Sequence, residues 1–60
     1  MKVTNFLLAA DEAIRAGFIA AAVFWLKSAL AQANKTHDAR RGRIMAALSY
    51  ARRIRKAEGL

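Results

Sequence analysis

The stretch AGFIAAAVFWL, residues 16–26, is eleven residues long and carries no charged side chain. It mixes alanine, the strongest helix former, with large apolar residues, and proline is absent from the whole chain. We therefore expect this stretch to be the apolar middle of a long helix. That helix is predicted to begin near Thr4 or Asn5, either of which can act as its N-cap, and to run to about Ala33.

The remainder of the chain predicts a second helix and an all-α fold. Polar residues at 34–37 indicate a short loop, and Asp38 is a suitable N-cap for a basic amphipathic helix over 38–58. With three Gly and no Pro, the chain lacks the turn residues that strands and tight hairpins require. The predicted fold is a single domain, residues 1–60, built as a helical hairpin of two unequal helices, the first spanning 4–33.

The small size of the chain limits how much of its stability can come from its own core. A chain of 60 residues buries only about 60% of the surface that its unfolded form exposes. Disulfides and thiolate metal sites are excluded because the chain has no Cys, and the single histidine, His37, cannot assemble a zinc site alone. We therefore expect no metal and no cofactor, and we expect stability to depend on an oligomer, a complex or a membrane.

The first predicted helix is apolar nearly all round, which one partner helix cannot cover. At 100° per residue, its apolar residues fall into more than one stripe, and small residues at four-residue spacing, Gly17 among them, would let a neighbouring helix approach closely. We predict that this helix mediates association with copies of itself or with a partner protein. The candidate association residues are Leu7, Ile14, Phe18, Trp25 and Leu26.

The positive charge lies mainly in the last 26 residues. Residues 1–34 carry three basic and two acidic side chains, a net +1, whereas residues 35–60 carry eight and two, a net +6. A cationic face above an apolar face suits a nucleic-acid backbone, anionic phospholipid headgroups or an acidic protein surface. Few Asn or Gln lie near these cations, so base-specific contacts are not expected. The candidate polyanion contacts are Arg41, Arg52, Arg53 and Lys56.

Two alternatives remain open from the sequence. In the first, the long helix inserts into a membrane, as in small pore-forming or virion-membrane proteins, and the basic C-terminal helix lies on the cytoplasmic side. The uncharged run is shorter than the roughly 20 residues that span a bilayer, and Lys27 follows it directly.

In the second, the sequence ALAQA at 29–33 resembles a signal-peptidase site, and cleavage would release a secreted cationic peptide. Asp11 and Glu12 are unusual ahead of such a site. A cytoplasmic or membrane-associated location is therefore favoured over secretion.

Catalysis is not expected. Asp11 and Glu12 are adjacent and point about 100° apart on a helix, so they cannot flank a substrate as an acid and base pair. No glycine-rich phosphate loop or nucleophile motif is present, and no small-molecule substrate is expected. The preferred interpretation is a small non-catalytic assembly protein, of a kind common among phage and bacterial accessory proteins.

Overall fold

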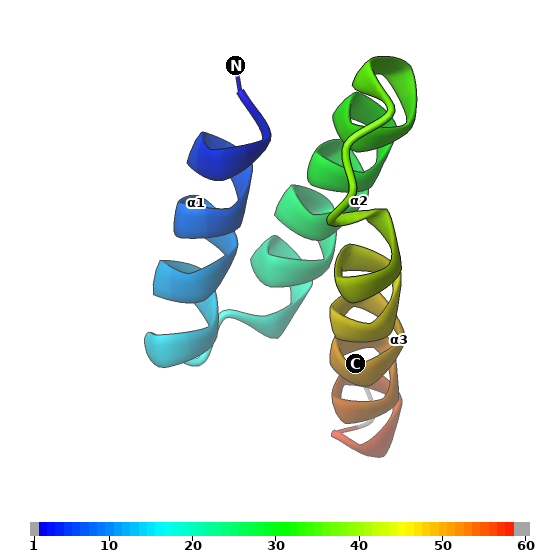
Figure 1. The fold of residues 1–60 in the computed structure, drawn as a ribbon. Coiled ribbons are helices and arrows are strands. Elements are labelled where there is room, and N and C mark those ends of the chain that lie inside the picture. Colours follow the sequence, from blue (N-terminus) through cyan, green and yellow to red (C-terminus); the bar gives the residue numbers. More distant parts are fainter. Residues whose placement is uncertain (1, 59–60) are drawn as a thin grey trace.

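The computed structural model describes residues 2–58, and these form three helices and no strand (Figure 1). The helices are α1, Val3–Arg15, α2, Ile19–Thr36, and α3, Arg41–Ala57. The prediction of an all-α fold is confirmed. The prediction of a hairpin of two helices is wrong, because the first predicted helix, 4–33, is two helices.

The break between α1 and α2 lies at Gly17, which has a φ of +83°. The Gly17 N–H donates to the Ile14 carbonyl at 3.1 Å, and the Phe18 N–H donates to the Ala13 carbonyl at 2.8 Å. This pair of hydrogen bonds is the Schellman motif, which ends a helix with a left-handed residue and most often a glycine. Gly17 is therefore the stop of α1, and not a small packing residue inside a continuous helix.

The second loop also differs from the prediction, because α2 continues to Thr36. A second Schellman motif ends it, with His37 in the left-handed conformation at φ 55° and with the Asp38 N–H donating to the Ala33 carbonyl at 2.9 Å. The helix end satisfies its free carbonyls in this way although no glycine is available there. The chain reverses at 37–40 instead of 34–37.

The starts of α1 and α3 also lie at other residues than predicted. The N-cap of α1 is Lys2, without a side-chain cap, so neither Thr4 nor Asn5 caps this helix. The N-cap of α3 is Arg40, two residues beyond the predicted cap, Asp38. The Asp38 carboxylate instead accepts the backbone N–H of Arg40 at 2.8 Å, so it stabilises the turn that leads into α3.

The core lies where α2 packs against both α1 and α3, to which it runs antiparallel (Figure 1). Within the stretch 16–26 these two neighbours bury Ile19, Ala22, Val23 and Leu26, whereas Phe18 and Phe24 stay exposed. Alanines let the helices approach closely, and the larger core side chains all have branched aliphatic groups. The buried apolar residues are Val3, Ala10, Ala13, Ile19, Ala22, Val23, Leu26, Ala29, Ala33, Ile44, Leu48 and Ala51.

The two helix stops can be tested with substitutions of opposite effect. Gly17→Ala should lower the free energy of unfolding by about 1 kcal/mol, because alanine is strained at positive φ although its Cβ would meet no atom within 4 Å. His37→Gly should raise it by about 0.5 kcal/mol, because the left-handed position no longer carries a Cβ. Urea denaturation followed by circular dichroism measures both values.

The control is Gly42→Ala, at an exposed position within α3 where a Cβ also meets no atom within 4 Å. This variant should raise the free energy of unfolding by about 0.5 kcal/mol, because alanine favours the helix. A stabilising effect of Gly17→Ala equal to that of Gly42→Ala would show that the helix does not stop at Gly17.

Candidate functional site

The strongest candidate site is the exposed surface of α3. Ile44, Leu48 and Ala51 recur at helical spacing and are buried, so they fix which side of α3 faces α2. In Figure 1 the last turns of α3 extend beyond the connection between α1 and α2, which leaves that end open on several sides. Every basic residue of α3 is exposed: Arg41, Arg43, Arg52, Arg53, Arg55 and Lys56.

The electrostatics of this surface are one-sided. α3 contains six cations and no acidic residue. Between residues 2 and 58 the ion pairs are Arg15 with Asp11, at 3.1 Å, and Arg40 with Asp38, at 2.8 Å. None of the α3 cations takes part in an ion pair within this part of the chain, so neighbouring cations repel one another and both ends of the helix carry unpaired positive charge.

All four predicted polyanion contacts lie on this surface, and the structure adds two more cations to it. Arg41, Arg52, Arg53 and Lys56 are exposed as expected. Arg43 and Arg55 are exposed as well.

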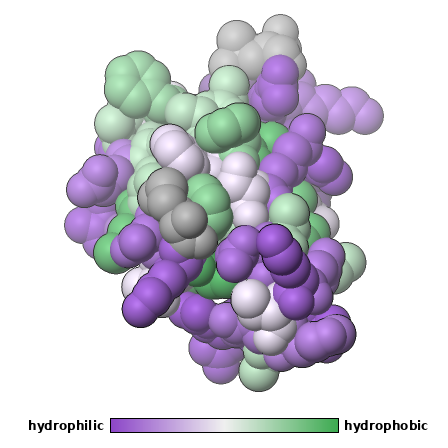
Figure 2. Space-filling model, turned by 90° about the horizontal axis from the view of Figure 1, so that it is seen from above, coloured by the Kyte–Doolittle hydropathy of each residue, from purple (hydrophilic) through white to green (hydrophobic). Residues whose placement is uncertain are grey.

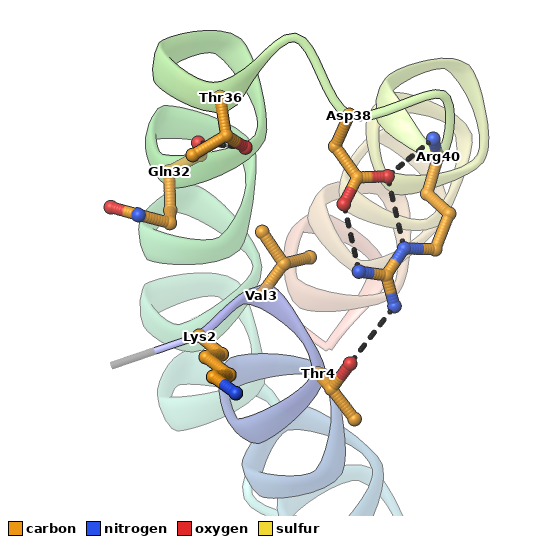
Figure 3. A pocket seen from close by; sticks show the side chains of 7 residues that line it. All are labelled: Lys2, Val3, Thr4, Gln32, Thr36, Asp38 and Arg40. Atoms are coloured by element: carbon orange, nitrogen blue, oxygen red, sulfur yellow. Dashed lines mark hydrogen bonds and ion pairs between the residues drawn. The ribbon is translucent and has the colours of Figure 1, made fainter.

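One further basic residue, Arg40, is held by the fold. Its Nε and Nη2 donate to the Asp38 carboxylate at 3.0 Å and 2.8 Å, and its Nη1 donates to the Thr4 hydroxyl oxygen at 3.1 Å (Figure 3). This bridge links the start of α1 to the turn between α2 and α3, beside an open hollow of about 250 Å³. Thr4 was predicted as a helix cap, and nothing in the sequence indicates that it would accept a hydrogen bond from a residue 36 positions later.

The same contacts shift the acidity of Asp38. The side-chain hydrogen bonds from Arg40, followed by the backbone N–H of Arg40, lower the pKa of the Asp38 carboxyl from 3.8 to about 2. The carboxylate therefore stays charged through the mildly acidic range. Arg40 is paired with Asp38, which offsets its charge locally.

The predicted association residues do not form one surface. The break at Gly17 leaves Leu7 and Ile14 on α1 and places Phe18 and Trp25 in the segment that runs back, so these residues do not lie along one helix. Leu26 is only 2% exposed and belongs to the core. Leu7 and Trp25 are half-buried, whereas Ile14 and Phe18 are exposed.

An aromatic cluster that the sequence did not assign to a site lies on the surface of α1 and α2. The Trp25 ring lies 6.0 Å from that of Phe6 and 5.1 Å from that of Phe24, measured between centroids. Phe6 meets Trp25 only because α1 folds back along α2, which a single long helix could not allow. Figure 2 shows hydrophobic residues gathered toward one side of the molecule and hydrophilic residues around much of the remaining outline.

The described chain brings together no group of three metal-ligating side chains, taking His, Cys, Asp and Glu over residues 2–58. Two of its acidic residues are in ion pairs, Asp11 with Arg15 and Asp38 with Arg40. The largest group of unpaired charged side chains among the described residues is the set of cations on the exposed surface of α3.

Across residues 2–58, no helix combines the length and the apolar character needed to cross a membrane. The membrane-inserted alternative placed the long predicted helix in the bilayer, and the structure has in its place α1, of 13 residues, and α2, of 18 residues. That alternative is therefore not supported.

Comparisons with protein-family models, with curated proteins and with solved structures give no match to this chain.

The Arg40 bridge gives a stability difference that depends on pH. Asp38→Asn should lower the melting temperature at pH 7, because the charged partner of Arg40 and the low-pKa carboxylate are lost. A carboxyl whose pKa is lowered by folding stabilises the fold above its unfolded pKa, near 3.9, and loses this effect as the pH falls through the folded value, about 2.

The difference in melting temperature between wild type and Asp38→Asn should therefore shrink between pH 4 and pH 2. Thermal denaturation at a series of pH values measures it, with Asp11→Asn as the control, since Asp11 pairs with Arg15 on an exposed face of α1. A difference that stays constant down to pH 2 would contradict the bridge.

Proposed function

We propose that this protein is a small non-catalytic interaction module whose α3 binds polyanions, with nucleic-acid phosphates, phospholipid headgroups and acidic protein surfaces as the candidate classes. The observation that supports it best is the set of six exposed α3 cations, none of which is in an ion pair within residues 2–58. A soluble surface usually intersperses charges of both signs, and α3 does not.

Binding to a polyanion would relieve a cost that the free protein carries. Arg52 and Lys56 lie four residues apart on α3, and Arg52 and Arg55 lie three apart, so these like charges face each other along the helix. A polyanion replaces this repulsion with attraction and releases its condensed counterions, which makes the affinity depend on salt. Five of the six cations are arginines, whose planar guanidinium can donate two hydrogen bonds to one phosphate.

The proposal predicts a change in salt dependence when cations are removed. The double variant Arg52→Ala, Arg53→Ala should reduce the slope of log K against log salt concentration by about 2, because two phosphate contacts are lost. Fluorescence anisotropy with a labelled DNA duplex, measured over a range of salt concentrations, gives the slope. Alanine preserves the helix, so circular dichroism should show no loss of fold.

The matched control is Lys27→Ala, Lys35→Ala, which removes two exposed cations from α2 and lowers the net charge equally. If binding depends on α3, this variant should keep most of the wild-type slope. Equal slopes for the two double variants would show that net charge alone, and not α3, attracts the polyanion. Absence of binding by wild type at low salt would refute the proposal.

A second proposed function is association through exposed apolar residues of α1 and α2, either with copies of the chain or with a partner protein. The observation that favours it is the exposure of Phe18, at 67%, and of Phe24, at 59%, beside the half-buried Trp25. Aromatic side chains of this size are enriched at protein interfaces. Association would also bury apolar area that a chain of 60 residues cannot cover by itself.

Phe18→Asp tests association without harming the fold. Phe18 occupies the N-cap position of α2, where a carboxylate interacts favourably with the helix dipole and should add about 0.5 kcal/mol of stability. We expect the variant to stay folded and to lose any oligomer that wild type forms, as measured by sedimentation velocity. The control is Met45→Asp, at an exposed apolar position on α3, outside the proposed association surface. An oligomer of unchanged mass in Phe18→Asp would remove Phe18 from the interface.

A further inference from the structure

We propose that the polyanion partner of α3 is duplex DNA and that α3 enters its major groove. This inference rests on the proposed binding of polyanions by α3, and it adds a class of partner and a binding geometry. Three features of α3 carry it: the shape of its outer side, the distribution of its cations along the helix axis, and the burial of its apolar side.

Over most of its length, the side of α3 that faces away from α2 carries small residues. Gly42, Ala46, Ser49 and Arg53 are offset by two residues from Ile44, Leu48 and Ala51, which turns them about 200° away from the side that faces α2. All four are exposed. We call this set the outer ridge. Because its first three side chains are small, a neighbouring surface can approach the helix backbone closely along it.

The cations flank an uncharged stretch. Residues 44–51 carry no charge, with Arg41 and Arg43 before them and four cations after them, from Arg52 to Lys56. At a rise of 1.5 Å per residue, the backbone distance between Arg43 and Arg52 is about 14 Å. The major groove of B-DNA is about 12 Å wide and admits an α-helix. A helix of 17 residues enters such a groove only lengthwise, so the cations near its two ends can contact phosphates along the groove edges while the outer ridge faces the base edges.

A membrane surface fits these features less well. An interfacial helix binds by burying its apolar face among the lipids, and in α3 that face is already buried against α2. What α3 offers outward is mainly charge and small side chains, together with the exposed Met45 and Tyr50. A flat headgroup layer would gain nothing from the small residues of the outer ridge, whereas in a groove they let the helix backbone lie deeper.

The experiment compares four ligands at low and moderate salt, with wild-type protein. Duplex DNA and duplex RNA of matched sequence and length carry similar charge, but the major groove of A-form RNA is too deep and narrow for side chains to read. The other ligands are heparin and vesicles that contain phosphatidylserine. We expect duplex DNA to bind about tenfold more tightly than duplex RNA, with heparin bound only through its charge.

A neutral substitution on the outer ridge separates shape from charge. Ala46→Leu adds bulk to the outer ridge, leaves the charge unchanged and suits a helix. It should weaken binding to duplex DNA about tenfold, because the larger side chain keeps α3 from seating in the groove, and it should leave heparin binding unchanged. The control is Ala31→Leu, at an exposed position on α2, which should change neither.

Each outcome decides a specific claim. Equal, salt-dependent binding of duplex DNA and duplex RNA, or an Ala46→Leu variant with wild-type affinity for DNA, would overturn groove insertion and leave polyanion binding intact. Binding to vesicles in preference to DNA would overturn the choice of partner. Failure to bind any of the four ligands at low salt would overturn the proposed function itself.

Discussion

The structure depends on one backbone conformation, the positive φ of Gly17. At that residue the chain can turn out of α1 and satisfy the last carbonyls of the helix within two residues, so α1 folds back along α2. A residue with a Cβ would pay for the same conformation in strain. Without the reversal, α2 would have α3 as its only neighbour within the chain, and the meeting of Phe6 with Trp25 would be lost.

The sequence predicted the helical class and the basic face because both follow from local composition. Ile44, Leu48 and Ala51 recur at helical spacing and are buried in the structure. The cations between and beyond them in the sequence are exposed. The stop at Gly17 was predictable in principle, since glycine is the usual residue after a helix end. It was missed because strong helix formers on both sides favour continuation, and local propensity does not show where a chain reverses.

Other features could not follow from the sequence in the same way. His37 takes a left-handed conformation that residues other than glycine seldom adopt, so the polar residues at 34–37 indicated a loop without marking the residue at which α2 ends. The Arg40 guanidinium reaches Thr4, which is close only after the three helices have packed. Contacts of this kind depend on tertiary structure.

The charges of α3 are not explained by the stability of the helix. Arg55 and Lys56 lie in its last turn, where each gains about 0.3 to 1 kcal/mol from the helix dipole. Like-charge pairs three and four residues apart, such as Arg52 with Lys56, cost about 0.2 to 0.5 kcal/mol each, and cations near the first turn oppose the dipole. These contributions roughly cancel, so folding alone gives no reason for six cations.

Packing in the core keeps α3 helical in the absence of a binding partner. An isolated helix of 17 residues with repelling charges is marginal in water, and ordering it on binding would consume part of the binding free energy. Ile44 and Leu48 pack into the same clusters as residues of α2, so α3 is already helical and already oriented. The residues that fold the chain thus also determine which side of α3 faces outward, and they present its cations in a fixed arrangement.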